Sequence, residues 1–431
     1  MSDQTFNRIS VIGLGYIGLP TAAMFASRRI EVIGIDVNAS VVDGVNKGEI
    51  HIVEPDLDIV VRAVVTQGLL RASLNPEPAD AFLVAVPTPF KGDNHEPDLK
   101  YIEAAAKAIA PVLEKGNLVV LESTSPVGTT EKMAEWLAAF CPNLTFPQTH
   151  GEDSDIRIAH CPERVLPGRV MYELIQNDRV IGGMTPRCSE MAVTLYKSFL
   201  VGECIVTDTR SAEMAKLSEN SFRDVNIAFA NELSIICDRL GIDAWEVIRL
   251  ANRHPRVSIL SPGPGVGGHC IAVDPWFIVA CAPEEARMIR TARDVNDGKP
   301  DWVMNKVHDA VASFLAQYPK LAAVDVTVAC YGLAFKPNID DLRESPALRI
   351  VQQLSKQHSG PILAIEPNIE ILPASLEGVE LVSLPEAHQR ADIHLYLVEH
   401  KQFRTAAQPI RYCIDTVGMF SDRKREMLAA Q

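Results

Sequence analysis

A cysteine that follows a run of glycines is the part of this sequence best suited to chemistry. Cys270 ends the stretch SPGPGVGGHC, and Asp274 lies four residues further on, in IAVDPWF. The glycines that precede the cysteine are Gly263, Gly265, Gly267 and Gly268. Glycine lets a backbone approach a ligand closely and adopt positive φ angles, and a thiol reacts as its thiolate, which a helix N-terminus or a nearby cation favours. We therefore interpret Cys270 as a candidate nucleophile, with Asp274 in reach if a helix begins after the cysteine.

A glycine-rich turn near the N-terminus predicts a second site, for a dinucleotide. The segment VIGLGYIG has the spacing G-x-G-x-x-G directly after an apolar strand, and the next strand ends at Asp36. The residues of the turn that we expect to bind the cofactor are Gly13, Gly15, Tyr16, Ile17 and Gly18. A carboxylate at the position of Asp36 accepts from the ribose hydroxyls and repels a 2′-phosphate, so the pattern favours NAD over NADP. The alternative is an ordinary strand–turn–helix connection with a solvated aspartate.

Hydroxyl side chains follow two further expected strands. They lie in VPTPF and in ESTSPVGTT, and they are Thr88, Ser123, Thr124 and Thr130. In doubly wound sheets ligands bind outside the carboxyl ends of the strands, so these residues could line the cofactor crevice. For each of them taken singly, a local turn or helix cap is an equally good explanation.

The elements that must position these residues alternate in type along the first part of the chain. The expected strands are Arg8–Ile12, Glu31–Asp36, Ala81–Val86, Leu118–Glu122, Ile156–Cys161 and Cys204–Thr207, and expected helices between them include Leu99–Leu113 and Thr130–Ala139. Short apolar runs alternating with amphipathic helices predict an α/β domain with a parallel sheet covered on both faces. We assign residues 1–207 to this Rossmann-like, doubly wound NAD-binding domain.

The pattern then becomes helical before the alternation returns. Residues 208–240 contain neither proline nor glycine, and a second helical stretch runs from Pro283 to about Val311. Such long helices predict a central dimerisation region, residues 208–318, which also carries the cysteine loop. Residues 319–431 are expected to form a smaller Rossmann-like α/β domain. Its expected elements are strands at Asp325–Tyr331, Ile362–Ile365, Ile393–Val398 and Tyr412–Asp415, and a helix from Pro346.

The composition excludes several classes of function. The formal net charge of −14 argues against binding of nucleic acid, which needs clustered cations. The nine cysteines form no CxxC pair, which predicts a reducing compartment and neither a disulfide framework nor a metal site, and all except Cys270 are interpreted as buried structural residues. With no recognisable signal peptide and no run of 18 apolar residues, the sequence predicts a cytoplasmic protein without membrane association.

Over almost its whole length the chain resembles the UDP-glucose/GDP-mannose dehydrogenase family. The motifs that carry the resemblance are VIGLGYIGLP, HIVEPDL, VPTPF, ESTSPVG, CPERVLPG, KLSENSFRDVNIAFANEL, NRHPRV, GPGVGGHCIAVDPWF and GLAFKPNIDDLRESPA. The resemblance implies an NAD domain, a long central helix that builds a homodimer, and a C-terminal domain for the nucleotide sugar. It also implies two successive NAD-dependent oxidations at C6 of the sugar, without release of the aldehyde.

One departure bears on the substrate that the resemblance implies. Members that oxidise UDP-glucose resemble GGSCFxKD at the cysteine, whereas this chain has His269 before Cys270 and Val273 before Asp274. The lysine of that motif is therefore absent, which is similar to members acting on UDP-linked N-acetylated hexosamines. The motifs look closest to the branch that oxidises UDP-N-acetylmannosamine, for surface polysaccharide precursors, with UDP-N-acetylglucosamine as the alternative. For His269, a structural and a catalytic role stay equally open.

The resemblance gives roles to residues that the sequence alone would leave on a solvated helix face. Lys216, Asn220 and Arg223 are spaced i, i+4 and i+7, so that they project from one side of a helix. The implied roles are oxyanion stabilisation by Lys216 and Asn220 and substrate binding by these two and Arg223. Lys216, or a water held by Asp274, would be the first base, and Cys270 would form a thiohemiacetal and then a thioester.

The same resemblance extends to thioester hydrolysis and to recognition of the nucleotide. Water would be activated by Glu163 or oriented by Thr124 and Asp274. The remaining implied substrate-binding residues are Arg164, Val165, His254, Arg256, Gly267, Lys336 and Arg343, with His254 and Arg256 reaching the site of the partner subunit. Two other classes stay open: a hydroxyacid dehydrogenase that yields one NADH per substrate, and a non-catalytic NAD-binding redox sensor.

Overall fold

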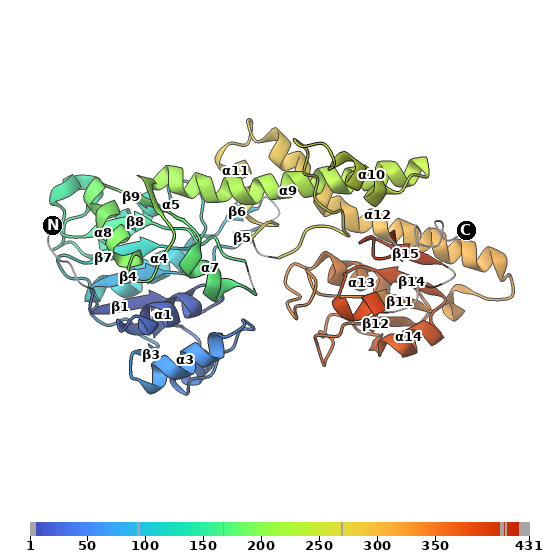
Figure 1. Cartoon of the computed structure of the whole chain (residues 1–431), viewed down its shortest axis with the longest axis horizontal. Coiled ribbons are helices and arrows are strands. Elements are labelled where there is room, and N and C mark those ends of the chain that lie inside the picture. The colour runs from blue at the N-terminus through green and yellow to red at the C-terminus, as the bar shows by residue number, and fades with distance from the viewer. Residues whose placement is uncertain are drawn as a thin grey trace. The chain divides into compact units, whose positions relative to one another are not determined.

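The computed structural model describes residues 6–92, 95–166, 168–268, 270–405, 409 and 412–421. His269 lies outside these residues. The chain divides into two compact units, of which the first comprises Met1–Glu219 with Trp276–Cys281 and the second comprises Asn220–Pro275 with Ala282–Gln431. Figure 1 shows the elements of each unit along the chain.

An eight-stranded sheet forms the centre of the first unit, in the order β10-β9-β8-β7-β4-β1-β2-β3. Its strands are β1 (Arg8–Ile12), β2 (Glu31–Ile35), β3 (Leu70–Ser73), β4 (Ala81–Val84), β7 (Leu118–Leu121), β8 (Arg157–His160), β9 (Arg179–Gly183) and β10 (Cys204–Asp208). All neighbours are parallel except β8 and β9, which are antiparallel. The predicted parallel sheet therefore contains one antiparallel pair of neighbours. An antiparallel strand begins at the edge where its neighbour ends, so the seven-residue helix α7 (Val170–Gln176) suffices as the connection.

Helices cover both faces of this sheet, as predicted for a doubly wound domain. They are α1 (Gly18–Ser27), α2 (Ala39–Asn46), α3 (Leu57–Thr66), α4 (Lys100–Ile109), α5 (Thr129–Phe140), α6 (Pro147–His150), α7 and α8 (Pro186–Tyr196). Adjacent strand residues alternate between two cores, because side chains along a strand point to opposite faces. Val11 packs in the core with Leu19 of α1, whereas Ile12 packs in the other with Ile102 of α4. A separate two-stranded ribbon is formed by β5 (Phe90–Lys91) and β6 (Glu96–Pro97).

Two long helices follow, close to the predicted positions. α9 spans Thr209–Leu240 without a break, and α12 spans Arg287–Gln317 with Pro300 inside it. The shorter α10 (Ala244–Ala251) and α11 (Asp274–Cys281) lie between them in the sequence. Among the described residues, these and all other helices are too short or too polar to cross a bilayer.

The C-terminal part is a parallel five-stranded sheet within the second unit, in the order β13-β12-β11-β14-β15. Its elements are β11 (Val328–Tyr331), α13 (Pro346–Gln357), β12 (Ile362–Ile365), β13 (Val379–Leu381), α14 (Leu384–Arg390), β14 (Ile393–Tyr396) and β15 (Cys413–Asp415). Short 3-10 turns occur at Ala110–Val112, Gly151–Asp153, Ala323–Asp325 and Lys401–Thr405. Val303, Val307 and Phe314 of α12 share one hydrophobic core with this sheet. The predicted three-part α/β fold is confirmed, while the boundaries at residues 207 and 318 stay predictions.

Candidate active site

The glycine turn after β1 has the geometry of a dinucleotide-binding turn. Gly13 adopts a φ of +94°, and a Cβ added there would lie 2.5 Å from the carbonyl oxygen of Ala85. A Cβ on Gly18 would lie 1.8 Å from the carbonyl oxygen of Gly13, so the start of α1 can pack here only without a side chain. A Cβ on Gly15 would meet nothing within 4 Å. The first and third glycines therefore serve packing, and the second faces open space where a pyrophosphate can approach. Tyr16 packs against the adjacent core, and Ile17 is the N-cap of α1, with no side-chain hydrogen bond at the cap.

Asp36 lies at the tip of β2 and is fixed by two backbone amides. Its carboxylate accepts from the N–H of Leu14 at 3.0 Å and from that of Asn38 at 2.9 Å. Carboxylate oxygens have further lone pairs, with which Asp36 can accept from ribose hydroxyls. The next residue, Val37, is 96% exposed and was missed by sequence reasoning. An apolar side chain beside the ribose position can pack on a purine ring. The position of Val37 directly after Asp36 is the feature of the sequence that could have indicated this role.

We expect Gly18→Ala to weaken NAD binding by roughly tenfold or more, since a misplaced helix start costs at least about 1.4 kcal/mol of phosphate interaction. The reason is the absence of space for a Cβ beside Gly13. Titration of protein fluorescence with NAD measures the dissociation constant. Gly44→Ala in α2 is the matched control, because a Cβ there meets nothing within 4 Å. Equal NAD affinities of the two variants would contradict the assignment of this turn.

The predicted hydroxyl residues after β4 and β7 have structural partners. Thr88 donates to the carbonyl oxygen of Thr124 at 2.5 Å, and Ser123 donates to that of Val86 at 2.7 Å. The backbone N–H and the hydroxyl of Thr130 both donate to the carboxylate of Glu213, at 2.8 and 2.7 Å. Glu213 thereby caps the N-terminus of α5. These bonds account for Thr88 and Ser123 as parts of the loops and for Thr130 as part of the first turn of α5. Contact of these residues with a cofactor stays a prediction.

The loop that follows β8 carries Glu163 and Arg164, which are both anchored in the first unit. Glu163 is buried and accepts from the guanidinium of Arg179 at 2.9 Å. Arg164 forms an ion pair with Glu219 at 2.7 Å and donates to the carbonyl oxygen of Asp178. Val165 packs against the neighbouring core. Arg164, a predicted substrate ligand, is thus already paired with Glu219. That carboxylate would compete with the substrate for the guanidinium.

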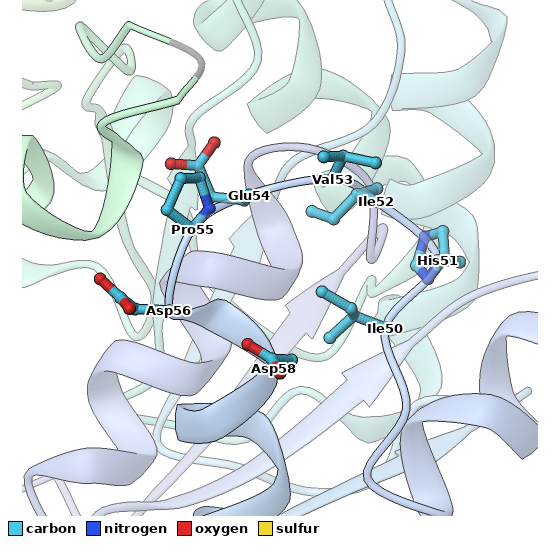
Figure 2. Close-up of a pocket in the computed structure, with 8 residues that line it drawn as sticks. All are labelled: Ile50, His51, Ile52, Val53, Glu54, Pro55, Asp56 and Asp58. Atoms are coloured by element: carbon cyan, nitrogen blue, oxygen red, sulfur yellow. The ribbon is translucent and has the colours of Figure 1, made fainter. Parts of the chain in front are cut away.

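The motif HIVEPDL supports this same loop. Figure 2 shows the segment from Ile50 to Asp58, which lines an open pocket next to α3. Glu54 is buried, and its carboxylate accepts from the backbone N–H groups of Gly168 and Val170 at 2.8 and 2.7 Å. Val170 is the first residue of α7, so Glu54 caps that helix and ties the two motifs together.

In the second unit the cysteine loop brings three predicted catalytic residues together. Cys270 is exposed, and its carbonyl oxygen accepts from the N–H of Asp274 at 2.8 Å. Helix α11 begins at Asp274, so the thiol precedes a helix N-terminus as expected. The buried carboxylate of Asp274 accepts from the side-chain amide of Asn220 at 2.5 Å. Lys216 lies one turn before Asn220 on α9, in the part of that helix that belongs to the first unit.

The glycines before Cys270 serve packing within the second unit more than sequence reasoning suggested. A Cβ on Gly267 would lie 2.6 Å from the carbonyl oxygen of Glu344 and 2.7 Å from Pro346. A Cβ on Gly265 would lie 2.9 Å from the same proline. The loop therefore needs glycine to pack closely on the segment FKPNIDDLRESP. That segment contains Lys336 and Arg343, which places two predicted nucleotide ligands on the segment that supports the cysteine loop.

The other predicted substrate ligands lie on the surface of the second unit. Arg223 is exposed on α9, and His254 and Arg256 are exposed after α10, where the N–H of Arg256 donates to His254. Arg343 forms a two-pronged ion pair with Asp341, with the shorter contact at 2.7 Å. Lys336 lies beside the ring of Phe335, at 6.0 Å from the centroid. A role of these cations in binding the nucleotide stays a prediction.

A buried polar network that sequence reasoning missed holds the cysteine loop to both long helices. Asn231 of α9 accepts from the N–H of Gly263 at 2.9 Å and donates to Asn296 of α12 at 2.9 Å. Asn296 donates to Asp224 at 2.8 Å, and Arg293 donates to the same carboxylate at 2.7 Å. Burial raises the pKa of Asp224, and the charge of Arg293 opposes that shift. The spacing of Asp224 and Asn231, two polar residues seven positions apart on α9, is the feature of the sequence that could have indicated this network.

The C-terminal sheet repeats the local geometry of the NAD-type turn. The N–H of Gly332, at φ +90°, donates to Ile365 at 2.8 Å, and the N–H of Leu333 donates to Glu366 at 2.8 Å. The equivalent bonds of the first turn, from Gly13 to Ile35 and from Leu14 to Asp36, measure 2.7 and 3.0 Å. The structure thus combines two turns of the nucleotide-binding type with an exposed thiol before a helix. These are the features of a nucleotide-dependent dehydrogenase that uses a catalytic cysteine.

Comparison with known proteins identifies the family. Models of the UDP-glucose/GDP-mannose dehydrogenase family match the chain as NAD binding domain over residues 7–200, central domain over 210–298 and UDP binding domain over 329–422. The chain belongs to this family of dehydrogenases. The family resemblance and the NAD cofactor predicted from the sequence are thereby confirmed.

Relatives extend over nearly the whole chain. It is 66% identical to UDP-N-acetyl-D-mannosamine dehydrogenase of Escherichia coli strain K12, over 93% of this chain and 95% of that one. It is 62% identical to an NDP-N-acetyl-D-galactosaminuronic acid dehydrogenase of Ralstonia nicotianae, over 98% of each. The solved structure of a UDP-D-ManNAc dehydrogenase from Pyrococcus horikoshii matches with a TM-score of 0.85 at 37% identity, covering 96% of both chains.

Proposed function

We propose that this protein oxidises UDP-N-acetyl-D-mannosamine at C6 to UDP-N-acetyl-D-mannosaminuronate, with two NAD consumed per turnover, for surface polysaccharide precursor synthesis. The observation that carries the chemistry is the cluster of Cys270, Asp274 and Asn220 at the start of α11. The substrate rests on the relatives, since the dehydrogenase of that name from Escherichia coli is 66% identical.

The reaction proceeds through a covalent bond to Cys270. Gly13, Gly15, Gly18 and Asp36 would hold NAD, which would supply the hydride acceptor for each of the two oxidations. Lys216, or a water held by Asp274, removes the C6 hydroxyl proton in the first one. The Cys270 thiolate then adds to the aldehyde and gives a thiohemiacetal, because an aldehyde yields no second hydride until a nucleophile makes its carbon tetrahedral. Loss of the second hydride leaves a thioester, which water hydrolyses to the acid.

Asn220 and Lys216 stabilise the negative charge that develops on the C6 oxygen. Asp274 accepts one N–H of the Asn220 amide at 2.5 Å and thereby fixes the plane of that amide. An amide nitrogen has a second N–H, which can point at the oxyanion. Thr124 and Asp274 orient the hydrolytic water, and Glu163 accepts its proton. Arg164, Val165, Arg223, Gly267, Lys336 and Arg343 hold the nucleotide sugar.

The experiment that tests this function measures NADH formed per mole of nucleotide sugar. UDP-N-acetylmannosamine is expected to yield two equivalents and to be preferred over UDP-N-acetylglucosamine and UDP-glucose. UDP-N-acetylgalactosamine belongs in the same assay, because a 62% identical relative carries a galactosaminuronic acid name. A preference for any of these other sugars would overturn the substrate. One equivalent would indicate a two-electron dehydrogenase, and none with any sugar would indicate a redox sensor.

The protein forms a homodimer through α9 in this proposal. Apolar side chains on one face of α9 are exposed at intervals of seven residues, which keeps them on the same side of the helix. They are Phe222 (69% exposed), Phe229 (54%) and Ile236 (46%). A second copy of the chain would cover this stripe, and His254 and Arg256 would then reach the site of the partner subunit. The nine cysteines are thiols rather than halves of disulfides, which supports a reducing, cytoplasmic location.

We expect Phe229→Glu to convert the dimer into monomers and to reduce turnover. A charge in the middle of an apolar interface loses the burial of a phenyl ring and cannot be solvated there, at a cost of roughly 3 kcal/mol or more for each subunit. Size-exclusion chromatography with light scattering measures the mass. Ile371→Glu is the control, because Ile371 is 83% exposed and lies outside α9. A Phe229→Glu protein that keeps the mass of the wild type would contradict dimerisation through this stripe.

A further inference from the structure

Arg179 of β9 lies buried between two carboxylates of the first unit. Its guanidinium donates to Glu163 at 2.9 Å and lies 3.9 Å from Glu122 at the end of β7. The side chain is 4% exposed and stacks on the ring of Tyr196, 4.5 Å from its centroid. A buried guanidinium is costly unless carboxylates and hydrogen bonds compensate it. A charge kept in such a place therefore needs an explanation beyond packing.

Both oxygens of Glu163 are held. One oxygen accepts from the guanidinium of Arg179, and the other accepts from the backbone N–H of Arg164 at 2.7 Å. Two hydrogen bonds to different oxygens fix the plane of the carboxylate, while each oxygen keeps a further lone pair for another donor. Glu163 is 8% exposed, so little other than a small molecule such as water can reach it.

The second carboxylate takes a different role in the cluster. Glu122 accepts from the hydroxyl of Tyr196 at 2.6 Å. Burial raises the pKa of Glu122 to about 7, against the opposing charge of Arg179. Glu163 is the nearer partner of the guanidinium, at 2.9 Å against 3.9 Å for Glu122. Glu122 and Tyr196 hold Arg179 in place from the other side.

We propose that Arg179 is a positioning residue for thioester hydrolysis, which holds the Glu163 carboxylate in the orientation that accepts a proton from the attacking water. The inference deepens the proposed function and rests on it. In this step the water oxygen bonds to the thioester carbon and its proton passes to Glu163. The carbon–sulfur bond then breaks, and Cys270 leaves as a thiolate with the bonding electron pair. No hydride moves, so Arg179 acts after both oxidations.

The test compares Arg179→Met with the wild type under excess NAD and UDP-N-acetylmannosamine. We expect a rapid burst of two NADH per active site at the rate of the wild type, followed by a steady state slowed roughly tenfold to a hundredfold, because a positioned base contributes about 10²–10⁴ in rate. Intact mass spectrometry should find the sugar acid bound to Cys270. Arg179→Lys keeps the charge but loses the planar guanidinium that donates to Glu163, and it should show the same burst with a smaller slowing. Glu163→Gln should reproduce the phenotype of Arg179→Met.

Arg157→Met is the matched control, since Arg157 is a buried arginine of the neighbouring strand β8 that donates to the carbonyl oxygens of Ser154 and Ile156. The Arg157→Met variant should be less thermally stable than the wild type but should show no burst of NADH. The proposal is overturned if Arg179→Met or, should that protein not fold, Arg179→Lys hydrolyses the thioester at the normal rate or is slowed equally in hydride transfer. A wild type that fails to give two NADH would instead refute the proposed function.

Discussion

Replacing Cys270 with serine is expected to leave NAD binding unchanged and to lower steady-state acid formation by about a thousandfold or more. A serine hydroxyl is almost wholly protonated at neutral pH, whereas a thiol before a helix N-terminus ionises readily. In this chain Cys270 is exposed and lies four residues before Asp274, the first residue of α11. Without a thiolate the aldehyde is not converted into a tetrahedral hydride donor, so the second oxidation fails. NAD binding should persist, because the glycine turn lies in the first unit and the cysteine in the second.

Cys281→Ser is the matched control for this experiment. Cys281 is the second exposed cysteine and ends the helix that begins after Cys270, so the prediction that every cysteine except Cys270 is buried is wrong for Cys281. Its replacement should leave NADH production close to that of the wild type. Quenched reactions of the wild type should show the sugar adduct on Cys270 by intact mass. Normal acid formation by Cys270→Ser, without any adduct in the wild type, would refute covalent catalysis.

The strands that sequence reasoning found are those with continuous apolar runs. β1, β4 and β7 are buried along most of their length, so their residues read as central strands of a parallel sheet. β9 was missed because it ends in Gly182 and Gly183, which depress strand propensity. The structure explains both glycines, since Cβ atoms there would lie 2.4 Å from the Asp208 carbonyl oxygen and 2.3 Å from the Ser189 hydroxyl. That reason depends on the packing of α8 and of the end of β10, and the local sequence does not show it.

The distinction between local signals and long-range packing also applies to the candidate active site. Cys270 and Asp274 are four residues apart, so their local relation could be read from the sequence, and the family resemblance supplied Asn220. Arg179 was missed because its partner Glu163 is 16 residues away and nothing in RVIGG distinguishes a buried arginine from a solvated one. Asn231 and Asn296 were missed for a similar reason, because they lie 65 residues apart on two helices. Long-range polar pairs depend on which faces of the elements meet, and no periodicity shows this.

The buried ion pair between α9 and α12 should dominate the stability of the second unit. Asp224→Ala is expected to lower the free energy of unfolding by about 3 kcal/mol, because it leaves the buried Arg293 with Asp297, a carboxylate that is 41% exposed, as its remaining ion-pair partner. Arg293 is 1% exposed, and the contact measures 2.7 Å. Asn296 would lose the same carboxylate and keep only its 3.1 Å bond to the backbone carbonyl oxygen of residue 224, so the support that it gives through Asn231 to the loop before Cys270 would weaken. Urea unfolding measures the stability, and steady-state NADH production at a temperature where the variant is folded measures the effect on the loop.

Asp238→Ala provides the control on the same two helices, because Asp238 pairs with Lys306 while remaining 40% exposed. An ion pair of that exposure contributes only about 0–1 kcal/mol, so this variant should unfold almost as the wild type does. The double variant Asp224→Leu with Arg293→Met should recover much of the lost stability, since it removes both buried charges together. It should not recover the full activity, because Asn296 would still lack the carboxylate and keep only the backbone carbonyl oxygen of residue 224 as acceptor. Equal losses of unfolding free energy in Asp224→Ala and Asp238→Ala would show that the buried network does not join the cysteine loop to the helices.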